Sequence, residues 1–166
     1  MGKKLQLTPE AVREVLDYDP ETGIFRWKLS RGRAPAGAVA GHPHPQGYWA
    51  IRVFTIDILA HQLAWFYVYG VFPPEIDHKN RDKRDNRLSN LRECSHPQNQ
   101  WNVGALRSNK TGIKGVSLHK SSGLYRARLR VNNTNIMVGY FKTLEEAAAA
   151  YRQRAQLEHG EFYGHD

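Results

Sequence analysis

The chain has 166 residues, a formal net charge of +8 and a pI of about 9.7, which together favour an anionic partner such as nucleic acid. Charge alone leaves other basic proteins open. Cys94 is the only cysteine, which excludes an intrachain disulfide and a zinc site of four thiolates. No apolar stretch is long enough to cross a membrane, and the N-terminal residues lack a signal-peptide core, so we expect a cytoplasmic protein.

The N-terminal part predicts a short helix followed by a small antiparallel sheet. Thr8 is a typical N-cap and Pro9 a typical first helical residue, so we expect a helix over residues 9–17 and a turn over residues 18–23. Aromatic and β-branched runs between glycines and prolines predict strands at residues 24–28, 37–41 and 48–54. Residues 58–69 are apolar on nearly all sides and precede Gly70, which indicates a buried helix with a glycine C-cap.

Residues 73–102 are polar and rich in Asp, Asn, Arg and His, which suits a site better than a core. We expect a strand that delivers Asp77 and His78, a loop, a return strand at residues 91–94 and a helix capped by Ser95. Neighbouring side chains point to opposite faces of a regular strand. The strand must therefore bend or end at Asp77 and His78 if both are to face one ligand.

The C-terminal part predicts a three-stranded sheet packed on one helix. Residues 104–111 indicate a linker, and strands are expected at residues 115–119, 125–131 and 136–141, with turns at 121–123 and 132–133. Thr143 is an expected N-cap for a helix over residues 144–159. Ala127 and Leu129 should face this helix, leaving the alternate arginines in solvent. The predicted fold class is α+β.

The polar segment contains the groups that phosphodiester hydrolysis requires. A neutral imidazole can deprotonate water, and a hard cation held by carboxylate and amide oxygens can neutralise charge developing on the phosphate. On composition and spacing alone, a different interpretation is favoured. The segment could be a turn-rich surface loop whose Asn side chains cap the backbone.

Three spaced motifs resemble the ββα-metal motif of zinc-free HNH homing endonucleases of bacteriophages. They are Asp77-His78-Lys79-Asn80, the stretch from Asp85 to Arg92, and Asn99, preceded by a helix with His61 and Gly70 at matching positions. The resemblance covers residues 8–103.

This resemblance implies a metal-dependent DNA endonuclease or nickase of a phage or prophage, acting in the bacterial host. It makes His78 the general base and Asn90 the residue that steadies the motif and the histidine. It makes Asp77 and Asn99 the ligands of one divalent cation, Mg²⁺ or alternatively Mn²⁺, with no structural zinc. Asn102, one helical turn further on, is a competing ligand. The expected products carry a 5′-phosphate and a 3′-hydroxyl.

The C-terminal pattern resembles the APETALA2 (ethylene-response-factor) DNA-binding domain over residues 111–160. The motifs on which this resemblance rests are Gly115-Val116, Val138-Gly139-Tyr140-Phe141 and Glu145-Glu146-Ala147-Ala148. The resemblance implies double-stranded DNA as partner and groove-facing positions at Lys114, Ser117, His119, Arg128, Arg130 and Asn135. The family's first-hairpin tryptophan is missing, so its sequence preference does not carry over.

These patterns predict a nuclease module over residues 1–103, a linker over 104–111 and a DNA-binding domain over 112–166, in a monomer or weak dimer. A DNA-binding regulator with an inert HNH scaffold is the main alternative, and RNA binding rests on positive charge alone. The intact set of Asp77, His78, Asn90 and Asn99 favours the nuclease.

Overall fold

The computed structural model describes residues 7–131 and 134–164, and the chain divides into two compact units, Met1–Ser95 and His96–Asp166. Helices and small antiparallel sheets make the fold α+β, as predicted. Residues 96–103 fall in the second unit, whereas the sequence pattern assigned them to the first; the three domain ranges stay a prediction. The turn expected at residues 132–133 lies outside the described residues.

The first unit begins with helix α1 (Pro9–Val15), whose N-terminus is capped as predicted because Thr8 Oγ1 accepts a hydrogen bond from the amide of Ala11. The helix ends at Val15 and not at residue 17. Leu16 and Tyr18 are buried in alternation with exposed neighbours, so Leu16–Asp19 forms strand β1 instead. Strand β1 pairs antiparallel with β2 (Ile24–Trp27).

A second, three-stranded sheet consists of β3 (His42–Pro43), β4 (Trp49–Val53) and β5 (Ile56–Leu59), with β4 in the centre. The strand expected at residues 37–41 is reduced to a bridge between Arg26 and Val39. Strand β5 was not predicted. Its apolar Ile58 and Leu59 suit a strand and a helix equally, so the sequence pattern merged them with the following helix.

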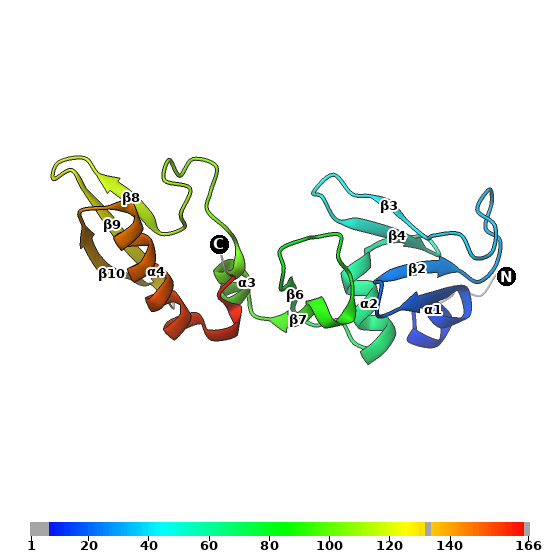
Figure 1. Ribbon diagram of the computed structural model, residues 1–166. Coiled ribbons are helices and arrows are strands. Elements are labelled where there is room, and N and C mark those ends of the chain that lie inside the picture. The colour runs from blue at the N-terminus through cyan, green and yellow to red at the C-terminus, as the bar shows by residue number, and fades with distance from the viewer. Residues whose placement is uncertain (1–6, 132–133, 165–166) are drawn as a thin grey trace. The chain divides into compact units, whose positions relative to one another are not determined.

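Helix α2 (Ala60–Tyr69) forms the centre of the first unit and ends at Gly70, which has the expected left-handed conformation. Leu63, Ala64 and Phe66 are buried and pack in one cluster with side chains of α1 and both sheets. Figure 1 shows α2 in cyan-green beside these strands. The predicted role of this helix as core is confirmed.

Next along the chain, β6 (Glu75–His78) and β7 (Leu91–Cys94) form an antiparallel pair. A polar loop and the short 3₁₀ helix η1 (Leu88–Asn90) connect them. Strand β6 ends at His78, as the sequence required. The second unit then opens with α3 (His96–Asn102).

The second unit carries β8 (Val116–His119), β9 (Leu124–Val131) and β10 (Thr134–Phe141) in the antiparallel order β10-β9-β8. Helix α4 (Leu144–His159) lies across one face of these strands, and η2 (Gly160–Phe162) follows it. Thr143 and Glu146 form a complete capping box at the start of α4. Ala127 and Leu129 are buried against α4, as predicted. Among the described residues, no helix is long and apolar enough to cross a membrane.

The β1–β2 turn supports the polar loop of the first unit. Gly23 has a φ of 71°, and a Cβ built there would lie 2.4 Å from the backbone nitrogen of Arg87. The amide of Leu88 donates to the carbonyl of Pro20 at 3.0 Å. The turn and the loop are therefore in direct backbone contact, which only glycine at position 23 permits.

We expect Gly23→Ala to destabilise the first unit by more than about 2 kcal/mol, because left-handed strain and a backbone clash act together. Urea denaturation followed by tryptophan fluorescence measures the change. Gly32→Ala is the matched control: Gly32 also has positive φ, 60°, but a Cβ there meets nothing within 4 Å. That control should cost about 1 kcal/mol from strain alone. Equal losses in the two variants would show that the contact with the loop contributes nothing.

Candidate active site

The end of β6 places Asp77 and His78 inside the first unit, each only 5% exposed. Across the ladder, Asp77 pairs with Arg92 and His78 with Leu91. Burial of two such polar side chains is costly unless each has hydrogen-bonding partners. Their neighbours therefore decide what these two groups can do.

Asn86 holds the imidazole of His78. His78 Nε2 lies 3.3 Å from Asn86 Oδ1, while Asn86 Nδ2 donates to the carbonyl of Arg84 at 3.1 Å. The amide orientation of Asn86 is thereby set with its oxygen toward the histidine. In neutral His78 the proton then sits on Nε2, and Nδ1 is the nitrogen able to accept one.

The imidazole of His78 packs against two other rings. The centroid of His61, on α2, is 4.9 Å away in an edge-to-face arrangement, and that of Tyr48 is 6.1 Å away. Tyr48 also contacts His61, at 5.1 Å. Burial lowers the pKa of His78, opposed by the hydrogen bond to Asn86 and the charge of Asp77. His78 is thus favoured in the neutral form that a general base requires.

His61 is 5% exposed, and its Nδ1 is buried without a hydrogen-bond partner. Burial, with a smaller contribution from His78, lowers the pKa of His61 to about 3. The sequence favoured a core or supporting role for this histidine. Its ring contact with His78 agrees with that role.

The carboxylate of Asp77 is paired with a guanidinium. Arg92 Nε and Nη2 both donate to Asp77 Oδ2, at 2.8 and 2.5 Å, and both side chains are largely buried. Such a charge-assisted pair compensates for the desolvation of Asp77. Arg92 does not stand out in the sequence pattern, although its position opposite Asp77 follows once the two strands are paired.

Asn90 organises the loop between the strands. Its Oδ1 accepts the amide of Asn80 at 3.0 Å, and its Nδ2 donates to Asn80 Oδ1 at 3.0 Å and to the carbonyl of Asp85 at 2.7 Å. These bonds hold the loop, whereas the residue bonded to His78 is Asn86. Asn side chains do cap the backbone here, as the structural interpretation of the segment expected.

The expected metal ligands belong to different units. Asp77 lies in the first unit, whereas Asn99 and its competitor Asn102 lie on α3 in the second. Within residues 7–131 and 134–164, no three His, Cys, Asp or Glu side chains are grouped to hold a metal ion.

Five of the six expected DNA-binding residues share the sheet face opposite α4. In the strand register, Ser117 lies opposite Arg126, Asn135 opposite Arg130 and Met137 opposite Arg128. Side chains alternate along β9, so its buried Ala127 and Leu129 point toward α4 and its arginines point to the other face. This face holds Ser117, His119, Arg128, Arg130 and Asn135. Arg128, Arg130 and Asn135 are exposed.

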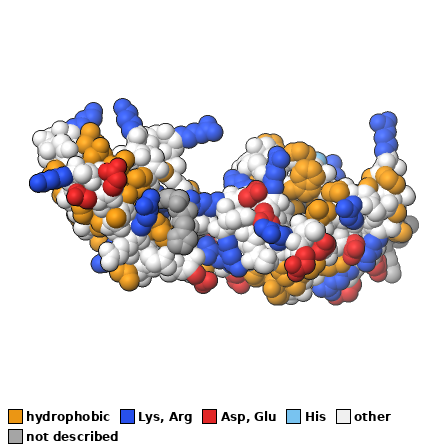
Figure 2. Space-filling model, in the orientation of Figure 1, with side chains coloured by type: hydrophobic (Ala, Val, Ile, Leu, Met, Phe, Trp, Pro, Cys, Tyr) orange, Lys and Arg blue, Asp and Glu red, His pale blue; other side chains and the backbone are white. Residues whose placement is uncertain are grey.

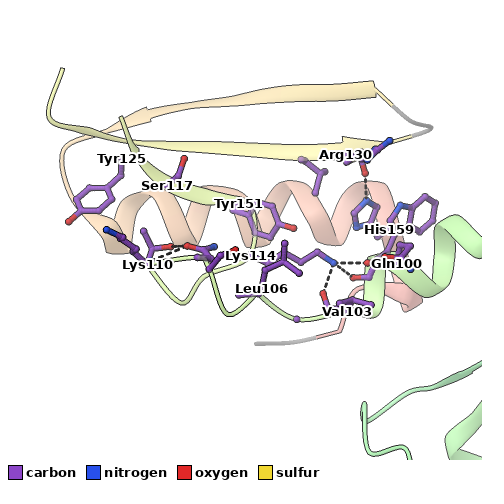
Figure 3. Close-up of a pocket in the computed structure, with 18 of the residues that line it drawn as sticks. Gln100, Val103, Leu106, Lys110, Lys114, Ser117, Tyr125, Arg130, Tyr151 and His159 are labelled. Carbon is purple, nitrogen blue, oxygen red and sulfur yellow. Dashed lines mark hydrogen bonds between the residues drawn. The ribbon is translucent and has the colours of Figure 1, made fainter. Parts of the chain in front are cut away.

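Lys114 has a different environment. Its Nζ donates to the carbonyls of Gln100, Trp101 and Val103 at 2.8, 2.9 and 2.5 Å, as the dashed lines in Figure 3 show. These carbonyls end α3, so the ammonium caps that helix. Trp101 on α3 also stacks on His159 of α4, with ring centroids 4.4 Å apart.

A pocket of about 1240 Å³ adjoins Lys114 in the second unit (Figure 3). Leu106, Leu129 and Tyr151 contribute to its walls, with Lys110 and Arg130 among its polar lining. All of its lining residues belong to the second unit, so it includes neither Asp77 nor His78.

Residues 59–101 match the family model described as HNH endonuclease. Protein 3.8 of Escherichia phage T7 is 31% identical to the chain over 104 residues, which is 61% of this chain and 85% of that protein. An uncharacterized HNH endonuclease of Acanthamoeba polyphaga mimivirus is 26% identical over 149 residues, 89% of this chain and 70% of its own. No solved structure matches the chain significantly.

The buried His61 predicts a specific pH dependence of stability. Its pKa of about 3 in the folded state lies below the ordinary 6.5, so the unfolded state binds the extra proton between these values. Stability conferred by neutral His61 is therefore present above pH 6.5 and is lost as pH falls. From pH 7 to pH 5 the loss should be about 2 kcal/mol.

The matched test compares urea unfolding of the parent protein and His61→Leu at pH 7 and pH 5. His61→Leu should show the smaller acid destabilisation, whatever its absolute stability. The exposed His42→Leu on β3 keeps the buried imidazole and should retain the parent's dependence. An unchanged pH dependence in His61→Leu would contradict the assignment of a depressed pKa to His61.

Proposed function

We propose that this chain, which belongs to a family of viral proteins with an HNH endonuclease domain, is a metal-dependent DNA endonuclease or nickase. The observation that carries the proposal is His78. Its imidazole is buried at a strand end, held through Nε2 by Asn86, and favoured in the neutral form. A fixed neutral imidazole beside a carboxylate suits the activation of water.

In this proposal, His78 Nδ1 accepts a proton from a water molecule as the water oxygen bonds to phosphorus. The bond from phosphorus to the 3′-oxygen breaks, and that oxygen takes up a proton. The products carry a 5′-phosphate and a 3′-hydroxyl, as the resemblance implies. Asn86 keeps the ring in the orientation and tautomer that this transfer needs, and Asn90 keeps the loop closed around it.

One divalent cation, Mg²⁺ or Mn²⁺, would be held by Asp77 and Asn99, with Asn102 as a competing ligand. The cation would supply positive charge against the phosphate oxygens and the leaving oxygen. Asp77 Oδ2 already accepts two hydrogen bonds from Arg92. Arg92 therefore orients the carboxylate and is itself a cationic group beside the proposed site.

The second unit is proposed to position double-stranded DNA. Arg128 and Arg130 are exposed on the sheet face opposite α4, together with Ser117, His119 and Asn135. A twisted β surface with arginines fits the major groove, where arginine binds guanine or phosphate. Lys114 keeps its proposed DNA role from the resemblance, although its ammonium caps α3. We also propose that the protein is a monomer or weak dimer in the cytoplasm of a phage's bacterial host.

A second candidate, a DNA-binding regulator without activity, is favoured by the closed Arg92–Asp77 pair. Cleavage of supercoiled plasmid with and without Mg²⁺ separates it from a nuclease. We expect nicked or linear products only with metal, and His78→Ala should lower the rate at least about 100-fold, because general bases contribute that much. DNA affinity of this variant should be unchanged, since a neutral imidazole attracts phosphate weakly.

His42→Ala serves as the control for loss of a histidine outside the site and should cut at the parent's rate. Circular dichroism checks that His78→Ala is folded. A parent protein that binds DNA but does not cut it, whichever divalent metal is added, would favour the regulator. A folded His78→Ala that cuts at the parent's rate would exclude His78 as the base.

The proposed reading face makes a separate prediction. Arg128→Ala/Arg130→Ala should weaken DNA binding and reduce the slope of log K against log salt by about 2, one for each lost phosphate contact. Arg152→Ala/Arg154→Ala removes the same charge from exposed positions of α4. Its slope should stay at the parent's value. Equal slopes for both double variants would remove the sheet face from the interface.

A further inference from the structure

Lys83 is an exposed lysine of the polar loop, and its ammonium lies over the ring of Tyr48, which also contacts His78. Its Nζ lies 4.5 Å from the centroid of the Tyr48 ring, and that ring lies 6.1 Å from the ring of His78. One aromatic side chain thus separates the ammonium from the proposed base. Neither the sequence motifs nor the family match assigns a role to Lys83.

A hydrogen bond also restricts the position of this ammonium. Lys83 Nζ donates to the carbonyl of Gln46 at 3.1 Å. Gln46 and Gly47 form the β3–β4 turn, so a hairpin distant in sequence fixes the end of the lysine. A lysine restrained in this way loses less conformational entropy on binding a ligand than a mobile one.

The backbone around Lys83 is also held. Asp82 Oδ1 accepts the amide of Arg84 at 2.9 Å, and the amide of Asp82 donates to Asn80 Oδ1 at 2.9 Å. The carboxylate of Asp82 thus accepts a backbone hydrogen bond. The carboxylate of Asp85 forms an ion pair with Arg87 at 2.5 Å. In the described part of the chain, Lys83 forms no ion pair with any of them.

We propose that Lys83 binds a DNA phosphate adjacent to the scissile one, and that Tyr48 and the Gln46 carbonyl position it for this contact. The ammonium has three N–H donors, and Gln46 uses one of them. A cation one aromatic ring away from the proposed base suits a neighbouring phosphate of the same strand. Figure 2 shows many exposed Lys and Arg side chains, and Lys83 differs from a merely solvated lysine in being held by a ring and a carbonyl.

The proposal rests on the proposed function, because the anion is taken to be DNA. Binding is therefore measured without divalent metal, by fluorescence anisotropy of a labelled duplex across a salt series, and cleavage is measured separately with Mg²⁺. A parent protein that binds but does not cut would overturn the nuclease and leave the Lys83 contact to be decided by the binding data.

Lys83→Ala should weaken duplex binding roughly fivefold and reduce the salt slope by about one phosphate contact. In cleavage it should raise KM with kcat nearly unchanged, and Lys83→Arg should restore most of the affinity. Lys28→Ala is the control, because Lys28 is an exposed lysine of the same unit at the end of β2. Equal changes of the salt slope in Lys83→Ala and Lys28→Ala would show that net charge alone accounts for the weaker binding, and would overturn the proposal.

A double-mutant cycle tests the positioning step. Tyr48→Leu removes the ring face, while Tyr48→Phe keeps it. If Tyr48 positions Lys83, the affinity loss of Tyr48→Leu should largely disappear in a Lys83→Ala background, because the two changes remove one contact. Tyr48→Phe should retain the coupling. Additive losses in Tyr48→Leu/Lys83→Ala would show that the two residues act independently and would overturn this step.

Discussion

The loop between Lys79 and Asn90 has almost no apolar side chains, and its shape depends on hydrogen bonds to a framework that does have a core. Tyr18, buried in β1, donates from its hydroxyl to the carbonyl of Asn86 at 2.7 Å, and burial raises the pKa of that hydroxyl. The backbone amide of Leu88 donates a hydrogen bond to the carbonyl of Pro20 in the β1–β2 hairpin. Asn86 in turn bonds to His78. The hydrophobic core of the first unit is therefore linked to the imidazole through one tyrosine and one asparagine.

The buried polar side chains of the first unit are tolerated because most of them have hydrogen-bonding or charged partners. Asp77 is compensated by Arg92, His78 by Asn86, and Asn90 by the backbone of its own loop. His61 is the exception, because its Nδ1 is buried without a hydrogen bond. Residues that reduce stability in this way are commonly retained where function needs them, and His61 lies against the ring on which the proposed chemistry depends.

Local signals predicted much of this fold. The caps at Thr8, Gly70 and Thr143 marked helix ends, and alternation placed Ala127 and Leu129 against α4. Motif spacing placed Asp77 and His78 at a strand end. The partners of these two residues were beyond such signals, because Arg92 is set by pairing between strands and Asn86 by the β1–β2 hairpin. Strand β5 was missed because a short apolar run does not distinguish strand from helix.

The capping of α3 by Lys114 determines where the chain could be divided without damage to this helix. The segment that matches the HNH family ends within this helix, yet the side chain that satisfies its last carbonyls comes from beyond the linker. A division between residues 103 and 113 would separate α3 from the lysine that caps it. A crossover just before His96, at the boundary between the two compact units, would keep α3 with its lysine. A C-terminal unit that begins at His96 therefore contains both α3 and the lysine that caps it.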